Sequence, residues 1–106
     1  MASTFNNQTA DLTGTSANIF TGPTANAGDR AIVIGCNISN THASDDATIT
    51  LYIDTHEILT NVKVPANTSL ELCRGNKYVL GQSENLKAKV TTGSAKTFVS
   101  ALVITV

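Results

Sequence analysis

The sequence predicts an all-β fold: an antiparallel β-sandwich, jelly-roll or immunoglobulin-like, of about eight short strands. Apolar residues recur at every second position over most of the chain, which is the period of a half-buried strand. β-Branched Val, Ile and Thr, which favour strands, dominate this alternation. Clusters of Gly, Pro and Asn interrupt the chain at the short spacing of a sandwich, and its 106 residues suffice for one core between two sheets.

Residues 1–7 are mostly polar and precede the first apolar alternation, so we expect a flexible N-terminal arm there. Residues 8–106 are expected to form a single β-sandwich domain, because no linker or internal repeat divides them. Turn residues such as Gly22-Pro23 separate the strands. The expected strands are 8–13, 16–20, 30–39, 47–54, 57–64, 69–73, 77–80, 86–92 and 96–106.

Most expected strands have one parity that is richer in large apolar residues, and this parity is expected to face the core. Leu59 interrupts the alternation of its strand, which indicates a bulge or a turn near Thr60 and Asn61. The inward residues of the clearest strands are Ile32, Ile34, Cys36, Ile38, Ile49, Leu51, Ile53, Ile58, Val62, Val64, Leu86, Ala88 and Val90.

The last strand, 96–106, carries apolar residues on both parities, and the strand 30–39 has Val33 opposite its isoleucines. Apolar side chains on the outer face of a small protein indicate an interface. The alternative, which the residues leave open at equal weight, is that loops or the N-terminal segment cover both faces within one monomer. The candidate interface residues are Val33, Tyr52, Val99, Ala101 and Val103.

Composition and charge exclude several classes of function. Charged residues make up only 14% of the chain, the net charge is −1, and the basic residues form no stripe that would bind nucleic acid. The segment Met1–Phe5 has neither the basic nor the apolar region of a signal peptide, and no apolar run is long enough to span a membrane. We therefore expect a protein that is made in a cytoplasm and is soluble there.

The two cysteines, Cys36 and Cys73, do not form a CxxC motif. In a reducing compartment we expect two thiols that act as small hydrophobic residues, because strand parity places Cys36 with the inward residues and Cys73 opposite Leu70 and Leu72. A disulfide between the two cysteines is the alternative.

No pattern indicates a catalytic, cofactor or metal site. His42 and His56 lack the spacing of metal ligands, and Asp45 and Asp46 stand in a loop without a calcium-binding run. No serine lies in a nucleophile elbow, and a thiolate at Cys36 would be buried among isoleucines. The scattered carboxylates available to pair are Asp54, Glu57, Glu71 and Glu84, as in any small protein. We expect no enzymatic activity.

The order of these elements resembles that of short virion proteins of tailed bacteriophages. The resemblance begins at about residue 9 and rests on strand and turn residues only. Its elements are a loop at Gly22-Pro23-Thr24, a strand with an Asn-rich end at 31–41, a strand with outward Thr at 48–54, the step Val-x-Val-Pro-Ala-x-x-Ser-Leu at 62–70, and a Gly-Ser turn before a final Val/Ile strand at 91–106.

The resemblance implies a capsid decoration or cement protein that stabilises the head shell by non-catalytic contacts, with a neck, tail or baseplate component as the alternative. It implies the major capsid protein or other virion proteins as partners, a homo-oligomer with a trimer favoured, and a place in the virion. It carries over no functional residue. A carbohydrate-binding module is a further hypothesis, against which the absence of Trp counts, and a hydrolase that depends on His42 or His56 is the last.

Overall fold

The computed structural model describes residues 2–42, 44–71, 78–93 and 95–105, and within these ranges it contains strands and turns but no helix. The predicted all-β fold is confirmed. The described ranges contain nine strands: β1 (Ala2–Asp11), β2 (Ala17–Thr21), β3 (Arg30–Asn40), β4 (Ala47–Ile53), β5 (His56–Val64), β6 (Thr68–Glu71), β7 (Tyr78–Leu80), β8 (Asn85–Thr92) and β9 (Lys96–Thr105).

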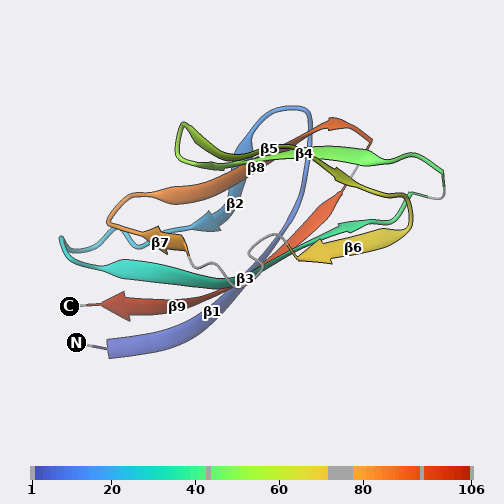
Figure 1. Cartoon of the computed structure of the whole chain (residues 1–106). Helices are drawn as coiled ribbons and strands as arrows, with labels where there is room; N and C mark the ends of the chain where they lie inside the picture. The colour runs from blue at the N-terminus through green and yellow to red at the C-terminus, as the bar shows by residue number, and fades with distance from the viewer. Residues whose placement is uncertain (1, 43, 72–77, 94, 106) are drawn as a thin grey trace.

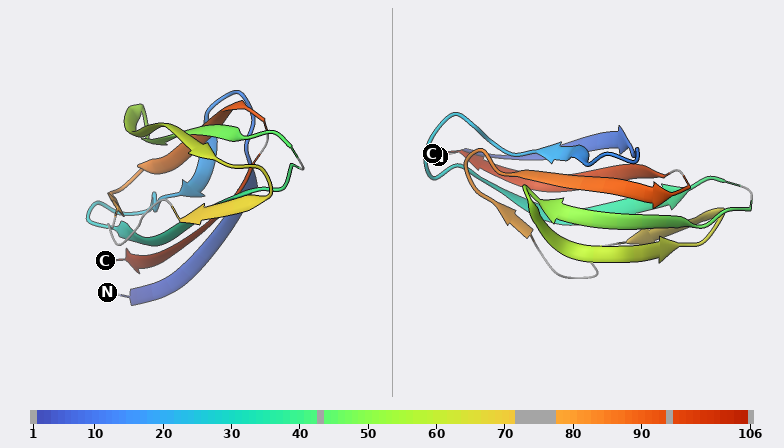
Figure 2. Two further views of the ribbon diagram at one scale, coloured as in Figure 1. Left: turned by 45° about the vertical axis from the view of Figure 1, so that its right-hand side comes forward. Right: turned by 90° about the horizontal axis from the view of Figure 1, so that it is seen from above.

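The strands form two antiparallel sheets that pack as layers (Figures 1 and 2). The first sheet has the order β1-β9-β3-β6, and the second has the order β2-β8-β4-β5. In the first sheet, β6 pairs with the end of β3, and β7 pairs with the beginning of β3 on the same side. With β6 and β7 counted as two parts of one edge, this is the strand order of a jelly roll, the first of the two predicted sandwich types. The beginning of β1 and the end of β9 lie side by side, since Ala2 pairs with Thr105.

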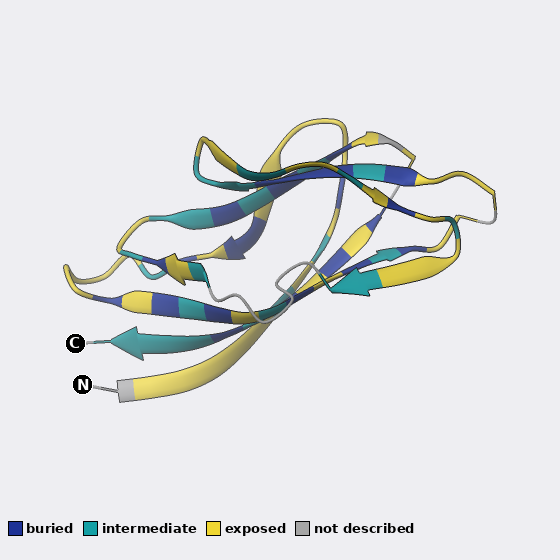
Figure 3. Ribbon diagram, in the orientation of Figure 1, coloured by how far each residue is buried: buried dark blue, intermediate teal, exposed yellow. Residues whose placement is uncertain are grey.

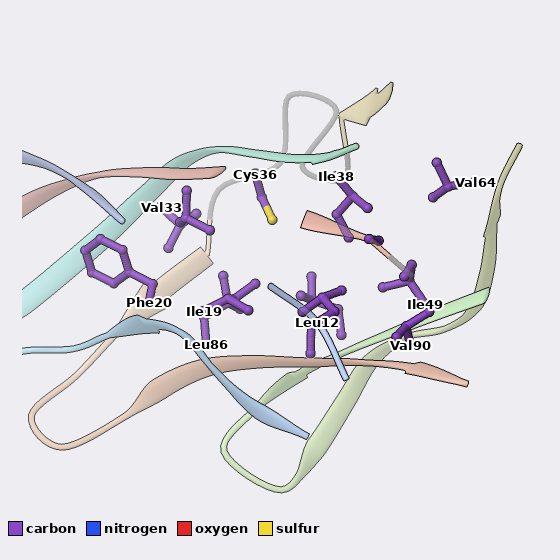
Figure 4. Close-up of a cluster of buried hydrophobic side chains, with 14 of the residues drawn as sticks. Leu12, Ile19, Phe20, Val33, Cys36, Ile38, Ile49, Val64, Leu86 and Val90 are labelled. Carbon is purple, nitrogen blue, oxygen red and sulfur yellow. The ribbon is translucent and has the colours of Figure 1, made fainter. Parts of the chain in front are cut away.

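The core lies between the two sheets. Figure 4 shows Val33, Cys36 and Ile38 projecting from β3 toward the side chains of Leu86 and Val90 on the second sheet. The alternation predicted for the second sheet is confirmed for Ile49, Leu51, Leu86, Ala88 and Val90, which are buried, while Ile53, Ile58 and Val62 are partly buried against the core. The other buried apolar residues are Leu12, Ile19, Phe20, Ala31, Ala47, Val64, Leu80, Ala95, Val99 and Ala101.

A β-bulge in β3 changes the side-chain parity within that strand. The pairing of β3 with β9 shifts register between Val33 and Gly35, so that Ile34 is the extra residue. The Cys36 N–H donates to Glu71 Oε1 at 2.9 Å, which satisfies a backbone donor beside the bulge. As a result, residues before the bulge that were expected to point inward point outward.

The assignment of inward residues in β3 was therefore half wrong. Cys36 and Ile38, which follow the bulge, are buried as predicted. Ile34 is exposed and Ile32 is half-buried, whereas Val33 is buried in their place. A count of alternate positions assumes an unbroken strand, and the bulge breaks it.

The N-terminal segment also differs from the expectation of a flexible arm over residues 1–7. Residues 2–7 form the first part of β1, which pairs residue by residue with β9 from Ala2 to Asp11. Polar side chains do not prevent strand formation, because the ladder is made by backbone groups. The segment is an edge strand of the sandwich domain.

The turn after β8 was expected to close a hairpin, but β8 and β9 belong to different sheets. The connection crosses from the second sheet to the first. Gly93 in this turn has a φ of +80°, and a Cβ there would lie 2.8 Å from the Asp46 carbonyl oxygen. Both constraints require glycine at this position.

Candidate interaction surface

Of the five residues predicted to form an interface, three lie in the core. Val33, Val99 and Ala101 are fully buried between the sheets. Val103 is on the same inner face and packs partly buried against the core. The prediction that these four side chains face outward is wrong. In β9, the side chains of Val99, Ala101 and Val103 face the core, and in β3 the bulge turns Val33 inward.

The outer face of the first sheet instead carries the other parity of these strands. Cross-strand pairing aligns Phe5 of β1 with Leu102 of β9, Leu102 with Ile32 of β3, and Ile32 with Val79 of β7. Residues that pair directly in an antiparallel sheet point to the same face with Cβ atoms about 5 Å apart. These four side chains therefore form one row across the whole sheet, and we call them the apolar row.

The apolar row is open to solvent at both ends. The exposed fraction is 74% for Phe5 and 49% for Val79, and Ile34 at the bulge is 47% exposed. Leu102, Ile32 and the nearby Ile104 are half-buried. Residues 3–7 of β1 are exposed as well, and Figure 3 shows this stretch of the strand in yellow. Large apolar side chains that are aligned rather than scattered mark an interaction site in a protein surface.

The outer face of the second sheet is polar. Its cross-strand pairs join Thr48 to Lys63 and Thr50 to Lys89, and Tyr52 stands between Glu57 and Lys87. Thr50 is itself buried, and its hydroxyl accepts a hydrogen bond from Asn61 N–H. Tyr52 is half-buried on this outer face, in agreement with its predicted outward direction. Its role in an interface stays a prediction.

The loop between β3 and β4 uses its polar groups to hold itself together. His42 Nδ1 accepts hydrogen bonds from the backbone N–H groups of Ser44 and Asp45, at 3.1 and 3.0 Å, and His42 Nε2 lies 3.6 Å from Asp45 Oδ2. Buried Asn40 anchors the same loop, because its Nδ2 donates to the carbonyls of Asp45 and Val64 and its Oδ1 accepts from His42 N–H. These contacts assign His42 a structural role in this loop.

The carboxylates considered as catalytic pairs or metal ligands mostly accept backbone hydrogen bonds. Asp46 accepts from Ala66 N–H, Asp54 from Asn85 N–H, and Glu84 from Gly81 N–H. Within the described ranges no group of three or more His, Cys, Asp or Glu residues could hold a metal ion. Over the same part of the chain, no helix has the length and apolar character needed to cross a membrane.

Cys36 is buried in the core, as its parity indicated. Cys73 lies outside the described residues, so the expectation that the two cysteines do not form a disulfide stays a prediction. The expected strand residues Leu72 and Lys77 and the turn at 74–76 also lie outside the described residues.

A hollow of about 490 Å³ lies at the opposite end of the first sheet from the apolar row. Phe98, which is 42% exposed, stands in it among polar neighbours. An aromatic ring with a few polar groups around it is a lining that small-molecule sites share. The residues that line the hollow are Thr9, Ala10, Asp11, Ser39, Lys96, Thr97 and Phe98.

Sequence reasoning did not identify Phe5, Ile34 or Val79 as surface residues of interest. Phe5 carried one signal, as a single large apolar side chain within a polar segment. Gly35 carried another, because a glycine inside a strand pattern often marks a bulge. Val79 carried none, since a strand as short as β7 does not reveal which face is inward.

Comparison with known proteins identifies a fold but no family. No protein-family model matches the chain, and no curated protein matches it. A solved structure from work titled as showing that Bacillus endospore appendages form a novel family of disulfide-linked pili superposes with a TM-score of 0.53. The match covers 98% of this chain and 88% of that chain at 14% sequence identity. At this identity the likeness shows that the two chains share a β-sandwich fold.

Proposed function

We propose that this protein is a structural subunit that acts by non-catalytic protein–protein contacts and assembles with copies of itself. The observation that carries the proposal is the apolar row, which crosses the outer face of the first sheet from Phe5 to Val79. Burying exposed apolar surface stabilises an interface by about 25 cal/mol per Å² removed from water. The fold shared with a pilus protein supports an assembly role.

The test of self-assembly is sedimentation velocity over a wide range of protein concentration. The variant Phe5→Ser/Ile34→Ser/Val79→Ser removes three exposed apolar side chains and is expected to sediment as a smaller species than the wild type. The matched control, Thr48→Ser/Lys63→Ser/Thr91→Ser, alters the outer face of the second sheet and is expected to behave as the wild type does. Equal behaviour of wild type and both variants would contradict the proposal.

The location that we propose is the virion of a tailed bacteriophage, with the protein as a decoration or cement protein on the head shell. This step rests on the sequence resemblance, which also implies contact with the major capsid protein and a trimer. Quantitative mass spectrometry of purified particles tests it. A copy number comparable to that of the shell protein is expected, and absence from particles would remove the virion proposal.

A neck, tail or baseplate component is the alternative within the same proposal. The same measurement separates the two locations, because a neck or tail ring holds few copies and a decorated shell holds many.

The hollow at Phe98 favours one further candidate, a carbohydrate-binding module. Binding on a glycan array that is lost in the Phe98→Ala variant would support it. An array without hits would close it, and the apolar row would be unaffected by either result.

A further inference from the structure

We infer that β1 is the edge at which a second copy of this chain adds its own β1, in antiparallel orientation, about a two-fold axis perpendicular to the first sheet. The inference rests on the proposed function, because it names the partner and the geometry of self-assembly. It puts a two-fold pair in place of the trimer that the resemblance implies. It depends on a separate observation, the contrast between β1 and the other sheet edges.

Three of the four sheet edges have features that block strand addition. β5 contains His56, Glu57 and Lys63, and its pairing with β4 shifts register at two places. β2 has only five residues and a register shift between Asn18 and Phe20. The remaining edge is divided between β6, with four residues, and β7, with three. Charges, bulges and short length are the means by which proteins protect edges.

β1 has none of these features. It has ten residues, pairs with β9 without a register shift, and contains no Pro and no charged residue before Asp11. On its other side, no strand in the described part of the chain pairs with it. Ser3 to Asn7 are exposed on both faces, so the second sheet does not cover this half of the strand. A long, regular, uncharged edge is a template for strand addition.

The charge pattern of β1 suits a second copy. In an antiparallel pair centred near Phe5 or Asn6, residues 3–7 of each copy face one another without any like charges opposite. The two Asp11 carboxylates then lie at opposite ends of the paired strands. Two-fold symmetry is also the commonest arrangement of homo-oligomers, since one patch serves both partners.

The apolar row gives the same geometry a second support. The row reaches the edge of the sheet at Phe5, whose side chain is the most exposed of the large apolar residues described. With a two-fold axis perpendicular to the sheet, the first sheets of the two copies turn their outer faces to the same side. The two rows would therefore join at Phe5 into one apolar strip across a continuous sheet. Such a strip would present twice the area for the contact between outer faces of further copies.

The direct test is a cysteine scan of positions 3–9, one residue at a time, in a Cys73→Ser background. Mild oxidation and non-reducing electrophoresis then measure the covalent dimer. We expect one maximum between positions 4 and 7, with yields that fall on both sides, because the residue on the axis faces its own copy. The background without an added cysteine and a Thr55→Cys variant at an exposed turn are the controls. A flat profile at the control level would overturn the pairing.

The second test is charge repulsion at the edge. Thr4 and Asn6 are exposed, so Thr4→Lys/Asn6→Lys is expected to leave thermal unfolding unchanged while weakening dimerisation by about tenfold or more. Ser44→Lys/Thr55→Lys adds the same charge at two exposed turn positions and is expected to dimerise as the wild type does.

The outcomes separate this inference from the proposed function. A trimer mass, or a dimer that the Thr4→Lys/Asn6→Lys change does not weaken, would overturn edge pairing and leave self-assembly through the outer face in place. A wild type that is monomeric at every concentration would overturn both.

Discussion

The outer faces of the two sheets differ in the side chains that their cross-strand pairs bring together. On the second sheet, half-buried Thr48 pairs with exposed Lys63, and Tyr52 lies between Glu57 and Lys87, so polar and charged side chains make up this face. On the first sheet, Phe5, Leu102, Ile32 and Val79 are aligned in one row. Both sheets contribute to the same core, so the core does not account for this difference.

The comparison shows that an apolar residue in a strand can serve either the fold or an interface, and that register decides which. In β9, Val99 and Ala101 are buried, whereas Phe98 is exposed and Leu102 is half-buried. Loss of an inner residue is expected to lower the free energy of unfolding, while loss of an outer residue is expected to affect assembly instead.

The largest expected effect is a difference in the free energy of unfolding between variants at two isoleucines of β3. Ile38→Ala removes a fully buried side chain and is expected to lower the free energy of unfolding by about 2–5 kcal/mol. Ile34→Ala, at the exposed bulge, is expected to lower it by less than about 1 kcal/mol. Urea unfolding of both variants checks this difference. Equal losses would mean that β3 is not bulged and that both isoleucines face the core.

The next largest effect is a difference in stability between variants at two asparagines of the same strand. Asn40→Ala leaves the buried carbonyl of Val64 and the part-buried carbonyl of Asp45 without their amide partner and is expected to cost about 1–3 kcal/mol. Asn37→Ala, which is exposed on the outer face, is expected to change stability by less than about 0.5 kcal/mol. Thermal unfolding of the two variants is the measurement. A neutral Asn40→Ala variant would show that this amide does not hold the loop.

The smallest effect concerns the bulge itself. Glu71→Gln weakens the charge-assisted hydrogen bond from Cys36 N–H and is expected to cost about 1 kcal/mol. The matched change Glu57→Gln, on the exposed edge strand β5, is expected to be neutral within about 0.5 kcal/mol. Chemical denaturation of both proteins measures the contrast, and equal stabilities would remove Glu71 from the account of the bulge.

The regular parts of the fold were predictable from the sequence. Alternation identified the buried residues Ile49 and Leu51 of β4, although Thr50 on the opposite parity, which was expected to point outward, is buried as well. The break at Leu59 predicted an irregularity near Asn61, and the structure has a positive φ of 52° there and a register shift in the same strand. Turn chemistry and period two suffice where a strand is amphipathic.

The candidate surface was not predictable in the same way. Counting positions in β3 and β9 assigned Val33, Val99 and Ala101 to the outer face, because both strands are apolar on two sides and parity alone does not say which side is inward. The bulge at Ile34 then reversed part of one strand. The polar sequence of residues 2–7 concealed an edge strand, since strand pairing there depends on backbone groups and on the neighbouring β9.

The most direct test of the central claim uses the isoleucine methyl signals in a nuclear magnetic resonance titration of protein concentration. The methyl groups of Ile32, Ile34 and Ile104 lie on the outer side of the first sheet, and those of Ile38 and Ile49 lie in the core. The account predicts concentration-dependent shifts for the first three and constant signals for the other two. Constant signals for all five, or shifts confined to residues of the second sheet, would contradict it.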